Sequence, residues 1–189
     1  MDEDFLTHRG LKATPEYCRA MGHTIFPLAA QFTKDYFHLT ETPQEIMDEW
    51  LALAREGYES HAPLKPGAAD FLRRAYEAGE TLVLVTACVP ELCHTALRRH
   101  GIDGYFSRIF FAQELGLEKR DPRYFAQVLE ALGCEAADCT LFEDSPGACR
   151  SAHEAGIHVV GVYDAFYARW RDELLANTDR YIQDFTDLL

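Results

Sequence analysis

The sequence lacks the short patterns that mark zinc-binding and nucleic-acid-binding proteins. Its six cysteines form no C-x-x-C pair, and its eight histidines include no H-x-H or H-E-x-x-H spacing. It has no run of Lys and Arg, and its formal net charge is -13. Because phosphate backbones are bound by clustered cations, this charge argues against a nucleic-acid partner. We therefore expect a zinc-free protein with reduced thiols and no nucleic-acid partner.

Long apolar runs are also missing. The longest strongly apolar window, residues 82–89, is far shorter than the roughly 20 residues of a membrane-spanning helix. The segment Met1-Asp2-Glu3-Asp4 is acidic and carries no signal-peptide pattern. Apolar content of 48% nevertheless describes an ordinary globular chain that can bury a core. We expect a cytoplasmic protein that does not bind membranes.

Residues 1–62 have the pattern of a small helical domain. Four helices are expected: residues 4–8, 15–21, 24–37 and one that begins at Thr42-Pro43. Thr42 is a capping residue, and Pro43 suits the first helical position. One face of the fourth helix is formed at helical spacing by Ile46, Trp50, Leu53 and Gly57.

Residues 63–189 have a different period, and the boundary is the Pro- and Gly-bearing segment 63–67. The run at 81–85 is apolar without alternation, as in strands buried on both faces of a parallel sheet. Helices are expected at 68–78, 90–100, 121–132 and 147–155, and strands at 81–85, 108–111, 139–142, 158–162 and near Tyr181-Ile182. This alternation predicts an α/β fold with a doubly wound, Rossmann-like parallel sheet.

Two adjacent carboxylates, Glu143 and Asp144, stand where the 139–142 run ends and the next helix begins. In open α/β sheets, ligands bind at the carboxyl ends of the strands. Paired carboxylates repel each other unless a cation or a shared proton relieves them, and Mg²⁺ together with a phosphate suits hard oxygen ligands beside a helix N-terminus. The alternative is that Asp144 or Ser145 simply caps the helix.

Two more polar groups follow predicted strands. Thr86 ends the first strand and precedes Ala87; its hydroxyl could donate to a phosphoryl oxygen or cap the helix that begins near Pro90. Lys119 precedes a helix that begins at Pro122, and its ammonium could neutralise a phosphoryl group in transit or be an ordinary solvated lysine. Three such groups in chain order point to a phosphoryl site.

These motifs resemble those of the haloacid dehalogenase-like (HAD) superfamily of phosphohydrolases, in the branch of β-phosphoglucomutase-like capped sugar phosphatases. An apolar strand ending in Thr matches 82–86, a Lys three residues before Pro matches Lys119, and an acidic pair, a helix ending in Ala-Gly and another strand match 142–157. The helical first third is similar to the family's four-helix cap, so the resemblance implies a cap domain at 1–62 and a core domain at 63–189.

The resemblance also implies roles for these residues. Thr86 and Ala87 would bind the transferring phosphoryl group, and Lys119 would stabilise its charge and that of the nucleophile. Asp144 would bind Mg²⁺ directly, with Glu143 helping through a water. Ser145 would hold a metal-bound water or the helix start. The implied substrate is a small phosphorylated metabolite such as a sugar phosphate.

The family's first motif, an apolar strand followed by Asp-x-Asp-Gly, has no match in the sequence. Its first Asp is the nucleophile that forms an aspartyl-phosphate, and its strand is the central one, between the strands ending at Thr86 and Phe142. No strand precedes Asp2-Glu3-Asp4 and no Gly follows, so we interpret these residues as the acidic start of a helix. The hypothesis is that the native protein is longer, through a start placed too far downstream or a truncation, and that the 189-residue form is inactive.

Three alternatives to a phosphohydrolase arise from the sequence. Cys93 and Arg99 have the C-x5-R spacing of cysteine phosphatases, but the segment between them has no Gly and is typical of a helix interior. Dehalogenase activity would not need the acidic pair. A non-catalytic protein that binds Mg²⁺ and a phosphometabolite without turnover is the alternative from another class. Candidate substrate-selecting residues in the helical domain are Arg9, Lys12, His23 and Lys34.

Overall fold

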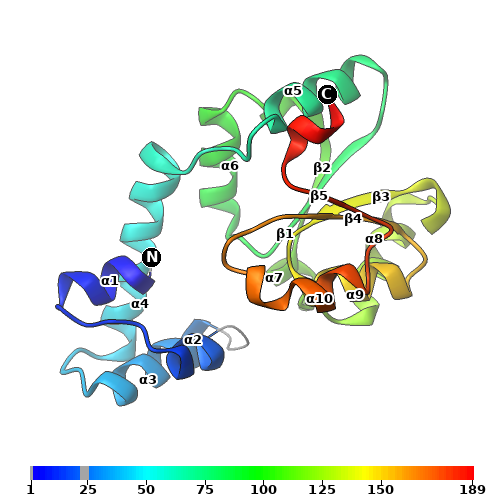
Figure 1. Cartoon of the computed structure of the whole chain (residues 1–189). Helices are drawn as coiled ribbons and strands as arrows, with labels where there is room; N and C mark the ends of the chain where they lie inside the picture. The colour runs from blue at the N-terminus through cyan, green and yellow to red at the C-terminus, as the bar shows by residue number, and fades with distance from the viewer. Residues whose placement is uncertain (1, 22–25) are drawn as a thin grey trace. The chain divides into compact units, whose positions relative to one another are not determined.

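The computed structural model describes residues 2–21 and 26–189. Contacts within the chain divide it into two compact units, 1–62 and 63–189, which are described separately (Figure 1). Of the residues singled out above, His23 and Thr24 lie outside the described residues. No helix in the described segments is long and apolar enough to cross a membrane.

The first unit consists of helices. They are α1 (Asp2–His8), α2 (Pro15–Met21), α3 (Phe26–Phe37), α4 (Pro43–Glu56) and a π-type turn at Gly57–His61. The predicted start of α4 is confirmed, because Thr42 and Glu45 form a capping box in which each side chain bonds the other residue's backbone N–H. Gly57 was expected on the apolar face of α4, but the helix ends at Glu56 and Gly57 begins the π-type turn.

The core of this unit is aromatic. Phe5 and Trp50 are completely buried, and their rings meet edge to face with centroids 5.8 Å apart. Tyr17 is buried in the same core, where its hydroxyl shares a 2.9 Å hydrogen bond with Thr33. This packing makes four short helices stable together, since helices of this length are marginal in isolation.

Two of the candidate substrate-selecting cations have structural partners in this unit. The guanidinium of Arg9 donates to both Glu41 and Glu49, with N–O distances of 2.8 and 2.6 Å, and lies over the ring of Phe5. The ammonium of Lys34 donates to the carbonyls of Leu39 and Glu41 near the end of α3. Both side chains therefore stabilise the helical unit; Lys12 is exposed.

The second unit contains two parallel sheets (Figure 1). In one, β1 (Leu82–Thr86) pairs with β2 (Phe106–Phe111); in the other the order is β3 (Thr140–Glu143), β4 (His158–Val162), β5 (Arg180–Ile182). The expected α/β fold with parallel strands is confirmed. β1 ends at Thr86 as expected, although it starts one residue later than the predicted 81–85 run, and β3 includes Glu143, one residue beyond its expected end.

Helices cover both faces of the strands. They are α5 (Ala68–Glu77), α6 (Pro90–Arg99), α7 (Ala112–Leu115), α8 (Pro122–Leu132), α9 (Pro146–Glu154) and α10 (Arg171–Leu175). Val83 and Val85 pack into the cluster formed by α8, α9 and α10, whereas Leu84 packs with α5 and α6. Figure 1 shows α9 and α10 on one side of the strands and α5 on the other. Side chains of β1 thus alternate between two helical layers.

Burial differs between the strands. The expectation that the first strand is buried on both faces was wrong. Every residue of β1 is only half-buried, whereas four of the five residues of β4 are buried. The reason is that β4 lies between two partners, while β1 is hydrogen-bonded to β2 alone among the described strands. In the described part of the chain, no strand joins β1 to β3, and the two strands have not closed up on each other.

Candidate functional site

Glu143 is the buried member of the acidic pair. It ends β3, is 6% exposed, and its Oε1 accepts hydrogen bonds from the backbone N–H groups of Asp144 (3.2 Å) and Ser145 (3.0 Å). The capping alternative is wrong for Ser145, because its side chain makes no capping hydrogen bond to α9. Ser145 occupies the N-cap position of α9, but its hydroxyl bonds Tyr167 instead.

Lys119 is the direct partner of Glu143. It lies in the loop between α7 and α8, and its Nζ is 2.6 Å from Glu143 Oε2. Its side chain is 20% exposed, so the solvated alternative is wrong. Burial by itself lowers the pKa of Lys119, but the carboxylates of Glu143 and Asp144 outweigh it and raise that pKa overall. Lys119 is therefore a permanently charged ammonium inside the second unit.

Asp144 has a different environment from Glu143. Burial, and then the neighbouring charge of Glu143, raise the pKa of its carboxyl to about 6, while Lys65 acts in the opposite direction. Lys65 Nζ lies 3.5 Å from Asp144 Oδ2 and 2.8 Å from Asp164 Oδ2. Asp144 is thus a crowded carboxylate whose nearest cation is shared with a second acid.

The region contains three further residues that the sequence did not single out. Lys65 lies in the Pro- and Gly-bearing segment that was interpreted only as a boundary. Asp164 follows β4 by two residues, so the rule that sites form at the carboxyl ends of strands would have found it. Tyr167 bonds Ser145 from the loop before α10, and no local pattern signals that contact.

Thr86 ends β1, and Ala87 follows it. Thr86 Oγ1 accepts a 3.0 Å hydrogen bond from the N–H of Cys88, which forms a local turn after β1. It does not cap α6, whose N-cap position is held by Val89, so that alternative is wrong. Ala87 is exposed. Their predicted part in phosphate binding stays a prediction.

A cavity of about 200 Å³ lies between the two sheets, beside these charged side chains. It is lined by Lys65, Val85, Lys119, Phe142, Glu143, Asp144, Val162 and Phe185. Val85 belongs to β1 and Phe142 to β3, so the cavity lies between these two strands near their carboxyl ends. Two ammonium groups and two carboxylates face a space large enough for a phosphoryl group and a cation.

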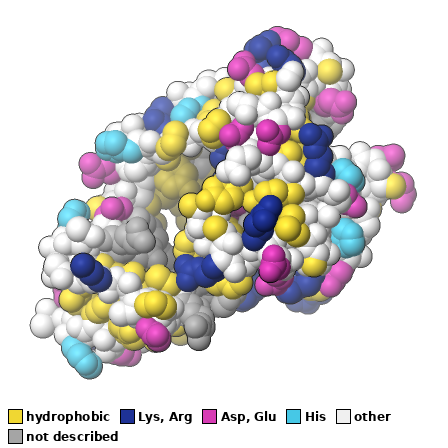
Figure 2. Space-filling model, in the orientation of Figure 1, with side chains coloured by type: hydrophobic (Ala, Val, Ile, Leu, Met, Phe, Trp, Pro, Cys, Tyr) yellow, Lys and Arg dark blue, Asp and Glu magenta, His cyan; other side chains and the backbone are white. Residues whose placement is uncertain are grey.

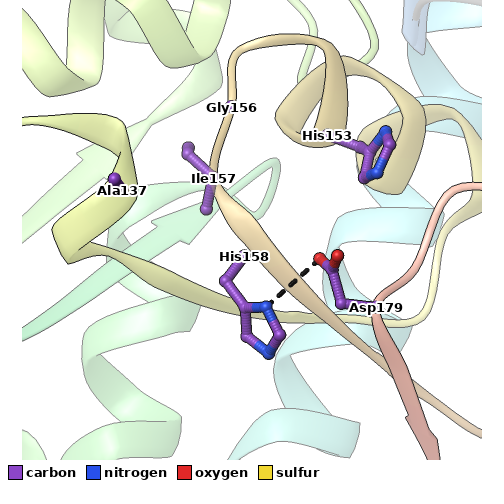
Figure 3. Close-up of a pocket in the computed structure, with 6 residues that line it drawn as sticks. All are labelled: Ala137, His153, Gly156, Ile157, His158 and Asp179. Carbon is purple, nitrogen blue, oxygen red and sulfur yellow. Dashed lines mark ion pairs between the residues drawn. The ribbon is translucent and has the colours of Figure 1, made fainter.

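A second cavity, of about 220 Å³, lies near the amino ends of the strands of the β3–β4–β5 sheet (Figure 3). It surrounds the start of β4, where His158 Nδ1 is 3.3 Å from Asp179 Oδ2. Asp179 also accepts the N–H of Val159 and bonds its carbonyl, which fastens β5 to β4. These contacts are structural.

Cys93 has no nucleophilic environment. It is buried inside α6, as the sequence predicted, and burial raises the pKa of its thiol to about 11. A thiol with that pKa stays protonated at neutral pH, which argues against cysteine phosphatase chemistry at this position.

The donor set at the cavity fits Mg²⁺ in one respect. Mg²⁺ is held in proteins by one or two carboxylates, with water and substrate phosphate as its other ligands. Asp144 supplies such a carboxylate, whereas Glu143 is already bonded to Lys119 and two backbone N–H groups. Among the described residues, no three His, Cys, Asp or Glu side chains are grouped to hold a metal by themselves. Phosphate or water oxygens would have to complete the coordination.

The comparison with protein families agrees with this architecture. The family model described as haloacid dehalogenase-like hydrolase matches residues 6–162. The chain belongs to this family. The alignment covers both helical and α/β units, so membership does not depend on the acidic pair alone.

Two curated relatives are similar to about half of this chain. Protein CbbY from Cupriavidus necator is 38% identical over 110 residues, 57% of this chain and 43% of that protein. Phosphoserine phosphatase from Thermus thermophilus is 36% identical over 101 residues, 53% of this chain and 41% of that protein. These matches span less than half the length of either relative.

Solved structures agree in fold. CbbY from Rhodobacter sphaeroides in complex with phosphate has a TM-score of 0.73 at 20% identity, over 98% of this chain and 86% of that chain. A HAD hydrolase of family IA from Entamoeba histolytica has a TM-score of 0.76 at 16% identity, over 99% and 85%. At these identities the likeness concerns the fold of the chain.

Proposed function

We propose that this protein takes part in the Mg²⁺-dependent hydrolysis of phosphate esters of small metabolites, such as sugar phosphates. The observation that carries the proposal is the cavity between β1 and β3, where Lys119, Glu143 and Asp144 meet at the carboxyl ends of parallel strands. Relatives named as phosphatases, including the phosphoserine phosphatase at 36% identity, support it.

The charges at the cavity suit a phosphoryl group. Lys119 is fixed by Glu143 at 2.6 Å and presents a permanent positive charge to the cavity. A pre-oriented ammonium stabilises developing negative charge on phosphoryl oxygens without having to reorganise. Mg²⁺, bound through Asp144, would neutralise further oxygen charge.

The size of the cavity favours a small substrate. About 200 Å³ is below the usual range for a drug-sized ligand, roughly 300–1,000 Å³. Figure 2 shows Lys and Arg side chains in small groups among acidic ones on the visible face, which does not resemble a surface for polyanions. A phosphoryl group in the cavity, with the rest of a small metabolite outside it, fits both features.

The reaction also needs a nucleophile. We propose that it is the first Asp of an Asp-x-Asp-Gly segment whose strand lies between β1 and β3, where the described strands leave both edges unpaired. The alternative is a protein that binds a phosphometabolite without turnover. The charged groups that line the cavity support it, because they are suited to binding a phosphate and a cation.

The test is hydrolysis of p-nitrophenyl phosphate with and without Mg²⁺. It compares this chain with a longer form that begins with an apolar strand and Asp-x-Asp-Gly, and with a matched longer form whose first Asp is Asn. We expect Mg²⁺-dependent activity in the longer form alone. Activity in this chain that is lost on Asp4→Asn would show that Asp4 is the nucleophile, and inactivity of all folded forms would favour the binding function.

A further inference from the structure

Lys65 is held at the cavity by its own backbone as well as by its charge. The carbonyl of Pro66 accepts a 3.0 Å hydrogen bond from the N–H of Phe185. Gly67 has φ +75°, and a Cβ there would come within 2.6 Å of the backbone nitrogen of Thr186. The segment is therefore docked closely against the C-terminal turn, and the lysine that precedes it has a defined starting point.

The ammonium of Lys65 serves two carboxylates. It donates to Asp164 Oδ2 at 2.8 Å and to the carbonyl of Tyr163 at 2.9 Å, and it lies 3.5 Å from Asp144 Oδ2. All three charged side chains are about one-third exposed. Its bonds to Asp164 and Tyr163 are the close ones, and its interaction with Asp144 is the longer one.

The charges around the cavity leave Asp144 without a counter-cation of its own. Four charged groups line the cavity, the ammonium groups of Lys65 and Lys119 and the carboxylates of Glu143 and Asp144. A fifth, the carboxylate of Asp164, lies behind Lys65 and is paired with it. Lys119 is committed to Glu143 at 2.6 Å. Asp144 therefore depends on Lys65, which it shares with Asp164.

We propose that Lys65 is the resident counter-cation of Asp144 and that Mg²⁺ binds at Asp144 only in competition with it. This inference rests on the proposed function. A divalent ion at Asp144 would repel an ammonium 3.5 Å from the same carboxylate. Asp164 and the Tyr163 carbonyl let Lys65 withdraw without losing all its partners, so Asp164 acts as a positioning residue that holds the lysine aside.

The test is calorimetric titration of the metal-free protein with MgCl₂. Lys65→Met should bind Mg²⁺ about tenfold more tightly than the unchanged protein, a factor that corresponds to about 1.4 kcal/mol. Lys65→Arg, which keeps the charge, should stay close to the unchanged protein. Lys12→Met removes the same charge from an exposed position in the other unit and should have no effect.

A second variant should change the Mg²⁺ affinity in the opposite direction. Asp164→Asn takes away the other partner of Lys65, so the ammonium should move onto Asp144 and weaken Mg²⁺ binding severalfold. In the Lys65→Met background the same Asp164 change should have much less effect, because the competitor is gone. This double-mutant cycle separates displacement of Lys65 from a general loss of negative charge.

The outcomes distinguish the inference from the proposed function. Equal Mg²⁺ affinity in the unchanged protein and Lys65→Met, or weaker affinity in the variant, would overturn the role of Lys65 and leave the Mg²⁺ site standing. An equal effect of Asp164→Asn in both backgrounds would also overturn it. No binding by any folded variant would overturn the inference, whereas the proposed function is overturned separately, by inactivity of the folded longer form. Circular dichroism in EDTA identifies folded variants.

Discussion

The two units each contain a cluster of acids around basic side chains, and the clusters behave differently. In the first unit, one guanidinium, Arg9, bonds both Glu41 and Glu49. The pKa of Glu41 is lowered by its own backbone N–H and then by Arg9, and the pKa of Glu49 is lowered chiefly by Arg9. In the second unit the pKa of Asp144 is raised to about 6 by burial and by Glu143. The first cluster is satisfied by its own partners, whereas the second keeps one carboxylate in an unfavourable state.

The difference separates a structural ion network from a candidate site. Perturbed carboxyl groups in clefts mark functional sites more often than satisfied pairs do, although structural networks can also shift a pKa. The direction of the shift is what distinguishes the clusters here. A lowered carboxyl pKa stabilises the fold at neutral pH, and a raised one costs stability that a bound cation can recover.

The largest effect should follow from Lys119→Met. The change leaves the buried carboxylate of Glu143 without its 2.6 Å partner, although two backbone N–H groups remain, and we expect a loss of about 3 kcal/mol in unfolding free energy. Urea denaturation of the metal-free protein measures it. The double variant Lys119→Met/Glu143→Gln should recover much of the loss; a double variant as unstable as the single one would show that the charge was not responsible.

Arg9→Met should have the next largest effect, confined to the first unit. Losing the guanidinium removes bonds to Glu41 and Glu49 and the contact with Phe5, which we expect to cost about 2 kcal/mol. Thermal unfolding followed by tryptophan fluorescence in a Trp170→Phe background, which leaves Trp50 as the tryptophan, reports on this unit. Lys12→Met, at an exposed position, is the matched control, and an equal loss in both would argue for a general charge effect.

Asp144→Asn should have the opposite sign and stabilise the metal-free protein. The folded-state pKa of Asp144 is about 6, above the ordinary value of 3.8, so its favourable contribution is complete at low pH and is lost as the pH rises through about 6. Allowing for its partial exposure, we expect a gain of about 1–2 kcal/mol at pH 8. The gain should disappear near pH 4 in EDTA; a gain that does not change with pH would contradict the assignment.

Glu49→Gln should give the smallest effect and the reverse pH dependence. The hydrogen bond from Arg9 lowers the pKa of Glu49, so its contribution is present above the ordinary value of 4.5 and is lost as the pH falls below it. We expect a loss of about 1 kcal/mol at pH 7 that shrinks in acid. Unfolding curves at several pH values measure it, and stabilisation at pH 7 would remove the distinction between the clusters.

The sequence predicted most of the fold because its strands and helices have strong periods. The bounds of α2 and β4 were predicted as they stand, and β1 was found to within one residue. The short helices α7 and α10 were missed, since four or five residues are too few to show a helical period. The two separate sheets follow from pairing, which no local pattern reveals.

The candidate site was predicted in part for a similar reason. Glu143, Asp144 and Lys119 follow strands or precede a helix, so local position identified them. The sequence does not show that Glu143, and not Asp144, bonds a lysine directly. That difference depends on Lys119, which lies 24 residues from Glu143. Lys65 could not be found locally, because its bond to the Tyr163 carbonyl spans 98 residues. The sequence suggests a substrate-binding role for Arg9 because it does not reveal the bonds from Arg9 to Glu41 and Glu49, which lie 32 and 40 residues away.

The most direct test of the account is the change in melting temperature when Mg²⁺ is added to the unchanged protein, Asp144→Asn and Glu49→Gln. The account predicts that Mg²⁺ raises the melting temperature of the unchanged protein and of Glu49→Gln by the same amount and leaves Asp144→Asn unchanged. An equal rise in all three proteins, or no rise in the unchanged protein, would contradict the claim that the cluster at β3 is a cation site.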